Sequence, residues 1–274
     1  MNEFRGRVVA LTGAASGIGA AVARAFAAEG ADVALSDVDA DGLAETEIAC
    51  KQLGYRVTTA LVDVADRDAV FAWADEVERT LGRVNVIVNN AGVALIADVA
   101  NMAHDDLRWV MDIDFWGVVH GTEAFLPKLE AAGEGHVVNI SSVFGLMSIP
   151  GQAAYNAAKF AVRGYTDALR MELEIAGSPI SATTVHPGGI KTAIVRNARH
   201  AITVDGPSSD EIESDFEAAA RTTPDEAAAQ ILRAVRRNRR RALIGPDAPV
   251  FDAVSRLPAA LSQRLLVAGA RRRR

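Results

Sequence analysis

The stretch from Arg7 to Asp37, RVVALTGAASGIGAAVARAFAAEGADVALSD, decides the fold. It begins with the apolar run Val8–Leu11, passes through a glycine-rich turn into small and apolar residues, and ends in a second apolar run, Val33–Leu35. A short apolar run that ends in glycines is typical of a buried parallel strand. The order strand, glycine turn, helix and strand therefore predicts the first unit of an α/β fold with a parallel sheet.

The glycines of this turn have a spacing that suits a dinucleotide. Gly13, Gly17 and Gly19 form the pattern G-x-x-x-G-x-G at the start of the expected helix. Gly13 permits a tight turn, Gly17 lets the backbone approach a pyrophosphate, and Gly19 lets the helix pack closely on the strand. The spacing differs from the common G-x-G-x-x-G fingerprint, and a glycine turn after a strand can also be only a turn.

Asp37 adds weight to the dinucleotide hypothesis and indicates which dinucleotide binds. It follows the second apolar run, 18 residues beyond Gly19. A carboxylate there can accept both hydroxyls of the adenosine ribose and would repel a 2′-phosphate. Neither Ser16 nor Val38 supplies a cation to offset that repulsion. The sequence therefore predicts NAD as the cofactor, with NADP disfavoured.

A possible proton-transfer group lies in the stretch SSVFGLMSIPGQAAYNAAKF, residues 141–160. Its alanine-rich end favours a helix, on which Tyr155 and Lys159, four residues apart, share one face. An ammonium beside a phenol lowers the tyrosine pKa from about 10, which makes the phenol a usable acid and base. Ser142 precedes the pair by thirteen residues and could hold the reacting oxygen. A tyrosine–lysine pair alone is more often surface packing.

Seven short motifs occur along the chain. They are the glycine turn from Thr12, Asp63-Val64, Asn89-Asn90-Ala91-Gly92, Asp114-x-x-Gly117, Ser142, Tyr155 with Lys159, and Pro187-Gly188 with Thr192. In this order and spacing, the chain resembles a short-chain dehydrogenase/reductase of the single-domain type. The resemblance implies a Rossmann-type, doubly wound, parallel seven-stranded sheet in the order 3-2-1-4-5-6-7, with helices on both faces.

The resemblance also assigns roles to individual residues. It places Ser142, Tyr155, Lys159 and the Asp114 position in the catalytic set. Lys159 would additionally bind the hydroxyls of the nicotinamide ribose. The residues that it assigns to the cofactor are Gly13, Ser16, Gly17, Ile18, Gly19, Asp37, Asp63, Val64, Asn90, Ala91, Gly92, Tyr155, Lys159, Pro187, Gly188, Ile190 and Thr192.

One residue departs from the family pattern, because Asp114 stands where the family usually has asparagine. In the family this residue lies at a kink in a long helix, where its backbone carbonyl holds a water that links the lysine to solvent. A backbone carbonyl survives the change to aspartate. The carboxylate could pair with Lys159 and oppose formation of the tyrosine phenolate, which would shift the working pH upward. The alternative is that Asp114 makes a local hydrogen bond, as asparagine would.

Composition and charge are those of a soluble cytoplasmic enzyme without a metal. The chain of 274 residues suits one domain, 1–274, and contains no apolar run of the ~18 to 20 residues that a membrane span needs. The charged start leaves no room for a signal peptide, and the single Cys50 excludes an internal disulfide. A net charge of −6 gives no reason to expect nucleic acid as a partner. The five histidines are widely spaced and lack a pattern of paired metal ligands.

Apolar strand-like runs alternate with helix-like segments along the chain, as in a parallel sheet with helices on both faces. The helices are expected to begin near Ile18, Gly42, Asp66, Asp105, Gln152 and Pro224. The expected strands are Val8–Leu11, Val33–Leu35, Val57–Leu61, Val84–Val88, His136–Ile140, Ser181–Val185 and Ala242–Ile244.

Two segments depart from this alternation. Residues 190–223 form a long excursion with an acidic patch, for which the resemblance implies a substrate lid and the alternative is a flexible loop. Residues 249–274 form an apolar, helix-like C-terminal extension that ends in four arginines. Such an end more often packs on a neighbouring subunit than on an anionic membrane, although the membrane contact is possible.

The expected activity is hydride transfer between NAD and a hydrophobic secondary alcohol or ketone. The hydrophobicity rests on Val143, Phe144, Leu146, Met147 and Ile149, which are candidates to line an apolar pocket beside Ser142. The alternative is a non-catalytic NAD-binding protein that senses redox state. The resemblance further implies a homotetramer assembled through the segments 105–129 and 152–174.

Overall fold

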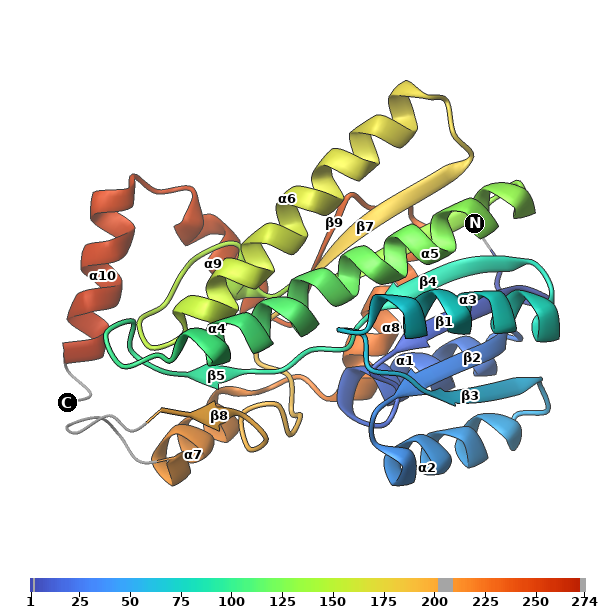
Figure 1. The fold of residues 1–274 in the computed structure, drawn as a ribbon. Helices are drawn as coiled ribbons and strands as arrows, with labels where there is room; N and C mark the ends of the chain where they lie inside the picture. The colour runs from blue at the N-terminus through green and yellow to red at the C-terminus, as the bar shows by residue number, and fades with distance from the viewer. Residues whose placement is uncertain (2, 202–208, 272–274) are drawn as a thin grey trace.

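The protein is built on a parallel sheet of seven strands, in a computed structural model that describes residues 1, 3–201 and 209–271. The strand order is β3-β2-β1-β4-β6-β7-β9, and each neighbouring pair is parallel (Figure 1). The fold class and strand order expected from the sequence are thereby confirmed. The strands are β1 Val8–Thr12, β2 Asp32–Asp37, β3 Val57–Leu61, β4 Val84–Asn89, β6 Gly135–Ile140, β7 Ile180–Pro187 and β9 Arg241–Ile244.

Helices cover both faces of this sheet (Figure 1). One face carries α1 (Gly17–Ala28), α2 (Ala40–Lys51) and α8 (Pro224–Arg236), with α1 packed between the other two. The other face carries α3 (Arg67–Leu81), α5 (Gly117–Ala132) and α6 (Ala153–Ile175), and α4 (His104–Met111) packs against α6. A π-helical turn, Asp112–Trp116, joins α4 to α5.

Local sequence explains where several helices begin. Pro224 is the first residue of α8, and Thr223 forms a capping box with Glu226. The Asp66 side chain caps α3 by accepting a hydrogen bond from the Ala69 backbone. The expected helix starts therefore agree with the structure to within about two residues, the usual uncertainty of helix boundaries.

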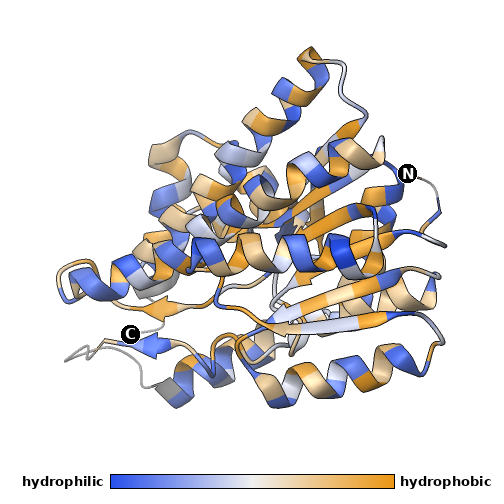
Figure 2. Cartoon of the chain, turned by 45° about the vertical axis from the view of Figure 1, so that its right-hand side comes forward, coloured by the Kyte–Doolittle hydropathy of each residue, from blue (hydrophilic) through white to orange (hydrophobic). Residues whose placement is uncertain are grey.

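The core lies on both sides of the sheet, because the inner strands are buried on both faces. All residues of β1, β4 and β6 are buried. Small side chains of α1, including Ala23 and Ala27, are buried in the core between this helix and the sheet, which lets the helix approach closely. Figure 2 shows hydrophobic residues along the strands and hydrophilic residues on the outer faces of the helices. No described helix is both long and apolar enough to cross a membrane.

Two short strands were not expected from the sequence. Leu95–Ile96 (β5) pairs in parallel with Arg199–His200 (β8), which ties the segment after the fourth strand of the sheet to the expected lid. Two-residue strands are too short to show a hydrophobic period, so only their meeting in space defines them. The ends of segment 190–223 are also joined by a bridge between Ile190 and Thr222. Helix α7 (Ser209–Ala219) lies within this segment, whose residues 202–208 fall outside the described part.

The C-terminal extension consists of two helices. Helix α9 runs from Ala248 to Ser255 and α10 from Ala259 to Arg271, with Pro258 between them. Proline cannot continue the hydrogen bonding of a preceding helix, which explains the break. The last three arginines of the sequence, 272–274, lie outside the described residues.

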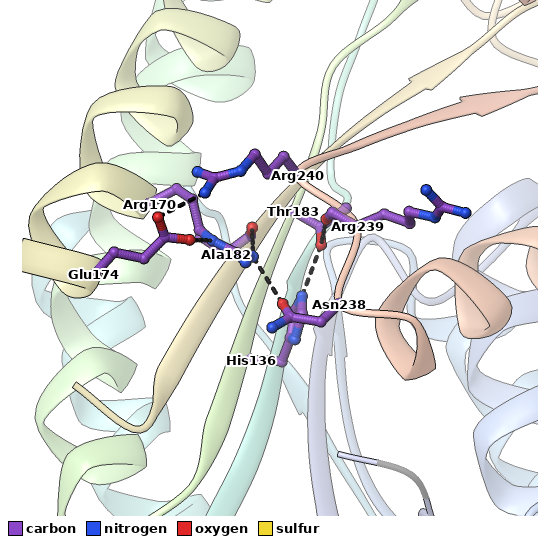
Figure 3. Close-up of polar contacts among 8 residues, drawn as sticks. All are labelled: His136, Arg170, Glu174, Ala182, Thr183, Asn238, Arg239 and Arg240. Atoms are coloured by element: carbon purple, nitrogen blue, oxygen red, sulfur yellow. Dashed lines mark hydrogen bonds and ion pairs between the residues drawn. The ribbon is translucent and has the colours of Figure 1, made fainter. Parts of the chain in front are cut away.

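A polar cluster joins α6, β6, β7 and β9 at the amino end of the sheet (Figure 3). The Arg170 guanidinium donates to the Ala182 carbonyl at 2.9 Å and to Asn238 Oδ1 at 2.8 Å. Thr183 donates its hydroxyl proton to the Arg239 carbonyl, so that it must accept from His136 Nε2 at 2.7 Å. His136 is therefore a neutral donor, and burial lowers its pKa to about 3, with the charge of Arg170 adding to the effect.

We expect His136 to make the protein less stable in acid. The pKa of this histidine is ~6.5 in the unfolded chain and about 3 in the folded protein. Between these two pH values the unfolded chain binds a proton and the folded protein does not, so the stability of the protein falls as the pH falls. His136→Gln keeps a donor toward Thr183 and should reduce the fall in Tm between about pH 6.5 and pH 4. The exposed His104 provides the control, because His104→Gln should leave the fall unchanged. Equal pH dependence of the wild type and His136→Gln would contradict this assignment.

Candidate active site

The predicted site residues come together because the strands of the sheet are parallel. The glycine turn follows β1, Asn90 follows β4, Ser142 follows β6, and Gly188 follows β7. Parallel neighbours present their carboxyl ends at the same edge of a sheet, where ligands bind in open α/β folds. One edge therefore brings together motifs that are separated by up to 175 residues, from Gly13 to Gly188.

The glycine turn has the shape of a phosphate-binding turn. Gly13 and Gly17 have φ angles of +69° and +54°, in the left-handed region that glycine adopts without strain. A Cβ at position 19 would overlap the Gly13 carbonyl oxygen, so Gly19 is required for the turn to close on itself. A Cβ at Gly17 would lie 3.1 Å from Thr192 Cγ2, which places the start of segment 190–223 over the turn.

Asn90 and Thr12 hold this turn against the next strand. The Asn90 side-chain amide donates to the Thr12 and Gly13 carbonyls at 3.1 and 2.9 Å. The Thr12 hydroxyl accepts from the backbone amides of Asn90 and Ala91 at 3.0 and 3.1 Å. Asn90 thus supports the turn with its side chain, while Gly92 is exposed. The contribution of the Thr12 hydroxyl was not anticipated from the motif.

Asp37 lies at the end of β2, beside the glycine turn. Its Oδ2 accepts from the Ala15 backbone amide at 2.8 Å, and its Oδ1 accepts from Val38 and Asp39 at 2.7 and 3.1 Å. Each carboxylate oxygen has two lone pairs, so Oδ2 retains room for a further donor such as a ribose hydroxyl. Ser16 is exposed in the same turn, where it is the N-cap residue of α1 without a side-chain capping bond, and Ile18 is half-buried.

The residues expected at the adenine lie after β3. Asp63 is exposed and accepts from the Ala65 backbone at 2.9 Å, whereas Val64 is 6% exposed. A Cβ at Gly117 would come within 2.6 Å of Val64 Cγ2, which explains why glycine follows the π-helical turn. The exposed carboxylate and the buried valine are thus presented at the same edge as the glycine turn.

The Pro187–Thr192 loop depends on a residue that was missed in the sequence. Asp247 Oδ2 accepts from the Gly189 backbone amide at 2.8 Å. A Cβ at Gly188 would overlap the Asp247 carboxylate, so the loop and this side chain fit only with glycine there. Ile190 is 3% exposed. Asp247 follows the last strand in the stretch Gly245-Pro246-Asp247, and no motif in the sequence connects it to residue 188.

The dinucleotide therefore fits the residues that are present. A glycine cradle at a helix N-terminus, a carboxylate beside it and a glycine loop after β7 are the elements that such a ligand needs.

Tyr155 and Lys159 share one face of α6, as the spacing predicted. Tyr155 is 9% exposed, Lys159 is 3% exposed, and the lysine Nζ lies 5.4 Å from the centre of the tyrosine ring. Ser142, which follows β6, is 7% exposed and lies near enough to Tyr155 to lower the pKa of its phenol. The Ser141 hydroxyl donates to the Lys159 carbonyl at 2.8 Å, which ties α6 to the end of β6.

Asp114 forms an ion pair with Lys159. Its Oδ2 lies 3.1 Å from Lys159 Nζ, and its Oδ1 accepts from the Val93 backbone amide at 2.7 Å. Asp114 has no exposed surface, and it lies within the π-helical turn, which is the helix kink expected at this position. Asp114 therefore pairs with the lysine, and it also makes a hydrogen bond, to the Val93 backbone, that asparagine could make as well.

The pKa of Tyr155 differs from the expectation based on its neighbour. Burial raises it, and the Asp114 charge adds to the increase, so that Lys159 and Ser142, which lower it, are outweighed. The expectation that the lysine lowers the tyrosine pKa left out burial and is wrong, whereas the opposing effect of the Asp114 carboxylate has the expected direction. Burial likewise raises the pKa of Asp114. Burial lowers the pKa of Lys159, but Asp114 and Tyr155 outweigh it and raise the value, so the ammonium keeps its proton.

Most residues expected in the apolar pocket are buried. Val143, Leu146 and Met147 are at most 8% exposed, whereas Phe144 is half-buried and meets the Tyr155 ring edge-on at 6.4 Å. Ile149 lines a separate groove of about 550 Å³ between α10 and the start of α6. This groove is lined by α6 residues on the side of the helix away from Tyr155, and it contains none of the predicted catalytic residues.

Comparisons with known proteins agree with this geometry. The family model described as short chain dehydrogenase matches residues 7–203. A Mycobacterium tuberculosis protein named "Putative oxidoreductase SadH" is 47% identical over 270 residues, which is 98% of this chain and 97% of that protein.

Solved structures show the same similarity. A short-chain dehydrogenase/reductase from Burkholderia phymatum, in complex with NAD, superposes with a TM-score of 0.84 at 30% identity, covering 93% of this chain and 94% of that one. An alcohol dehydrogenase from the archaeon Thermococcus sibiricus, complexed with 5-hydroxy-NADP, has a TM-score of 0.69 at 25% identity, covering 84% and 88%. With its parallel sheet, glycine turn and Ser142–Tyr155–Lys159 arrangement, the chain belongs to the short-chain dehydrogenase/reductase family and is an oxidoreductase.

Proposed function

We propose that this protein is an NAD-dependent alcohol dehydrogenase or carbonyl reductase that acts on a hydrophobic secondary alcohol or ketone. The observation that carries the proposal is the convergence of Ser142, Tyr155 and Lys159 at the edge of the sheet where the glycine turn lies. The half-buried Phe144 beside the tyrosine supports an apolar substrate. Segment 190–223, which begins beside the glycine turn, is the proposed lid.

The side chains divide the proton chemistry among them. A bound nicotinamide supplies or accepts the hydride. Tyr155 gives its proton to the substrate oxygen in reduction and takes it back in oxidation, while Ser142 positions that oxygen. Lys159 stays positive, stabilises the phenolate and would bind the nicotinamide ribose. Because burial and Asp114 raise the Tyr155 pKa, the free site holds the phenol in its protonated form at neutral pH, which is the form that reduction requires.

Tyr155→Phe tests the proposed activity. Turnover of a panel of secondary alcohols with NAD should fall by at least about a hundredfold, since only the proton carrier is lost and general acid–base catalysis contributes that much. NADH affinity, measured by fluorescence titration, should change little because the ring still packs against Phe144. A wild-type protein that binds NADH but turns over no alcohol or ketone would instead be a redox sensor.

A further prediction concerns the cofactor and rests on Asp37. We expect NADH to bind at least about tenfold more tightly than NADPH, a gap of ~1.4 kcal/mol, because the carboxylate repels the extra phosphate. Asp37→Ala should reduce this difference in affinity, mainly by weakening NADH binding. The exposed Asp41, on the next helix, is a control for charge alone, so Asp41→Ala should leave the ratio unchanged. Equal NADH and NADPH affinities for the wild type would refute the preference.

Asp114 is proposed to set the pH dependence of the reaction through Lys159. Its carboxylate contacts the ammonium directly and raises the Tyr155 pKa. Asp114→Asn removes the charge that opposes the phenolate, so the apparent pKa for alcohol oxidation should fall, by about one unit or less. Glu123→Gln, which removes a half-exposed carboxylate farther along the same helix, should leave the pH–rate profile unchanged. Superimposable profiles for the wild type and Asp114→Asn would show that the pair has no catalytic effect.

We propose a homotetramer in which the helices α5 and α6 contact other subunits. Large apolar side chains on these helices and the turn before them remain exposed: Trp116 by 48%, Phe160 by 38% and Met171 by 53%. Light scattering at micromolar concentration should give four times the chain mass of 28.9 kDa. Phe160→Glu with Met171→Glu should lower that mass, whereas Ile48→Glu, at an exposed position on α2, should not. A monomeric mass for the wild type would refute the assembly.

A further inference from the structure

The C-terminal helix α9 reaches the catalytic tyrosine through two aromatic rings. Phe251 on α9 meets Phe144 with a distance of 6.1 Å between ring centres and an angle of 83° between the planes. Phe144 meets Tyr155 in the same edge-on manner, at 6.4 Å and 82°. A row of three rings therefore runs from a helix beyond the last strand to the phenol that handles the proton.

Phe144 lies in the turn that directly follows Ser142. It lies in the short 3₁₀ turn Val143–Gly145, and its backbone amide donates to the Ser142 hydroxyl oxygen at 3.1 Å. Phe144 and Phe251 are both half-buried, whereas Val143 is 4% exposed and Tyr155 9%. Both phenylalanines are thus only partly covered by the protein, and Phe144 contacts the ring of Tyr155.

Hydrogen bonds connect Phe251 to the loop after β7, where the cofactor is proposed to bind. Asp247, one helical turn earlier, accepts from the Gly189 backbone amide at 2.8 Å, and its carbonyl accepts from the Phe251 amide at 3.2 Å. The loop after β7 and the ring of Phe251 are therefore joined by a single turn of helix. Farther along α9, Asp252 pairs with Arg256 at 2.8 Å, which stabilises the helix.

We propose that Phe251 is a specificity-determining residue of the substrate site, where it completes with Phe144 an aromatic wall beside Tyr155 that binds an aromatic substituent of the ketone or alcohol. The inference rests on the proposed function for its reaction and deepens it by naming the substrate class. Aromatic rings attract one another in edge-on and offset geometries beyond the effect of buried area. A substituent bound against this wall would place its carbonyl next to the phenol and Ser142.

The test compares acetophenone, which carries a phenyl group, with acetone, which does not, on full-length protein with NADH. For Phe251→Ala we expect kcat/KM for acetophenone to fall about tenfold, mainly through a higher KM, and that for acetone to change less than about twofold. Phe251→Leu keeps apolar bulk and should recover part of the loss, and it carries the test if the alanine variant does not fold. Val250→Ala, at a position 62% exposed on the same helix, is the matched control and should behave as wild type.

A binding measurement separates this inference from the proposed reaction. Saturation-transfer NMR of acetophenone with the NADH-loaded protein needs no turnover, and the signal should weaken in Phe251→Ala but not in Val250→Ala. If the wild type binds acetophenone through Phe251 without reducing it, the result contradicts the proposed reductase activity but supports the proposed aromatic binding site. Absence of acetophenone binding, binding that is independent of Phe251, or equal losses for both ketones would each overturn the inference.

Discussion

The candidate active site depends on keeping the charged amine of Lys159 inside the protein. An ammonium that is only 3% exposed has lost most of its hydration, and this costs several kcal/mol unless other groups replace the water. Asp114 lies 3.1 Å from the amine, and the Ile140 carbonyl accepts from it at 3.3 Å. The two partners come from the π-helical turn and from the end of β6, so the placement of both elements determines whether the lysine can remain charged.

The same pair affects the chemistry of its neighbour. A lysine paired with a carboxylate has less influence on the tyrosine than a lysine whose charge is free, because the opposite charge opposes the phenolate. Together with burial this raises the Tyr155 pKa, while the ammonium itself is stabilised. Aspartate at a position where the family usually has asparagine is therefore compatible with the fold, and its charge adds to the rise in the pKa of Tyr155.

The part of the chain beyond the motifs supports the site from a distance. At the amino end of the sheet, Arg170, Asn238 and the Thr183–His136 pair connect α6 and β6 with the strands β7 and β9 (Figure 3). At the carboxyl end, the segment after β9 supplies Asp247 to the loop of Gly188. Strand β9 thus has a group of polar contacts at each of its ends. It also places Phe251 of α9 next to the turn that follows Ser142.

The sequence by itself determined the fold class, the strand order through the family resemblance, and the meeting of the glycine turn, Ser142 and the Tyr155–Lys159 pair. The fold class follows from local patterns, since apolar runs, glycines and four-residue spacing act within a few residues of one another. The strand order and the meeting of residues far apart in the chain follow from the family resemblance. Only the tertiary structure decided the partners of Asp114, the raised pKa of Tyr155, and the positions of Asp247 and Phe251. Each of these depends on burial or on contacts between residues far apart in the chain, and neither property appears in a local pattern. The two-residue strands β5 and β8 could not be predicted from the sequence for the same reason.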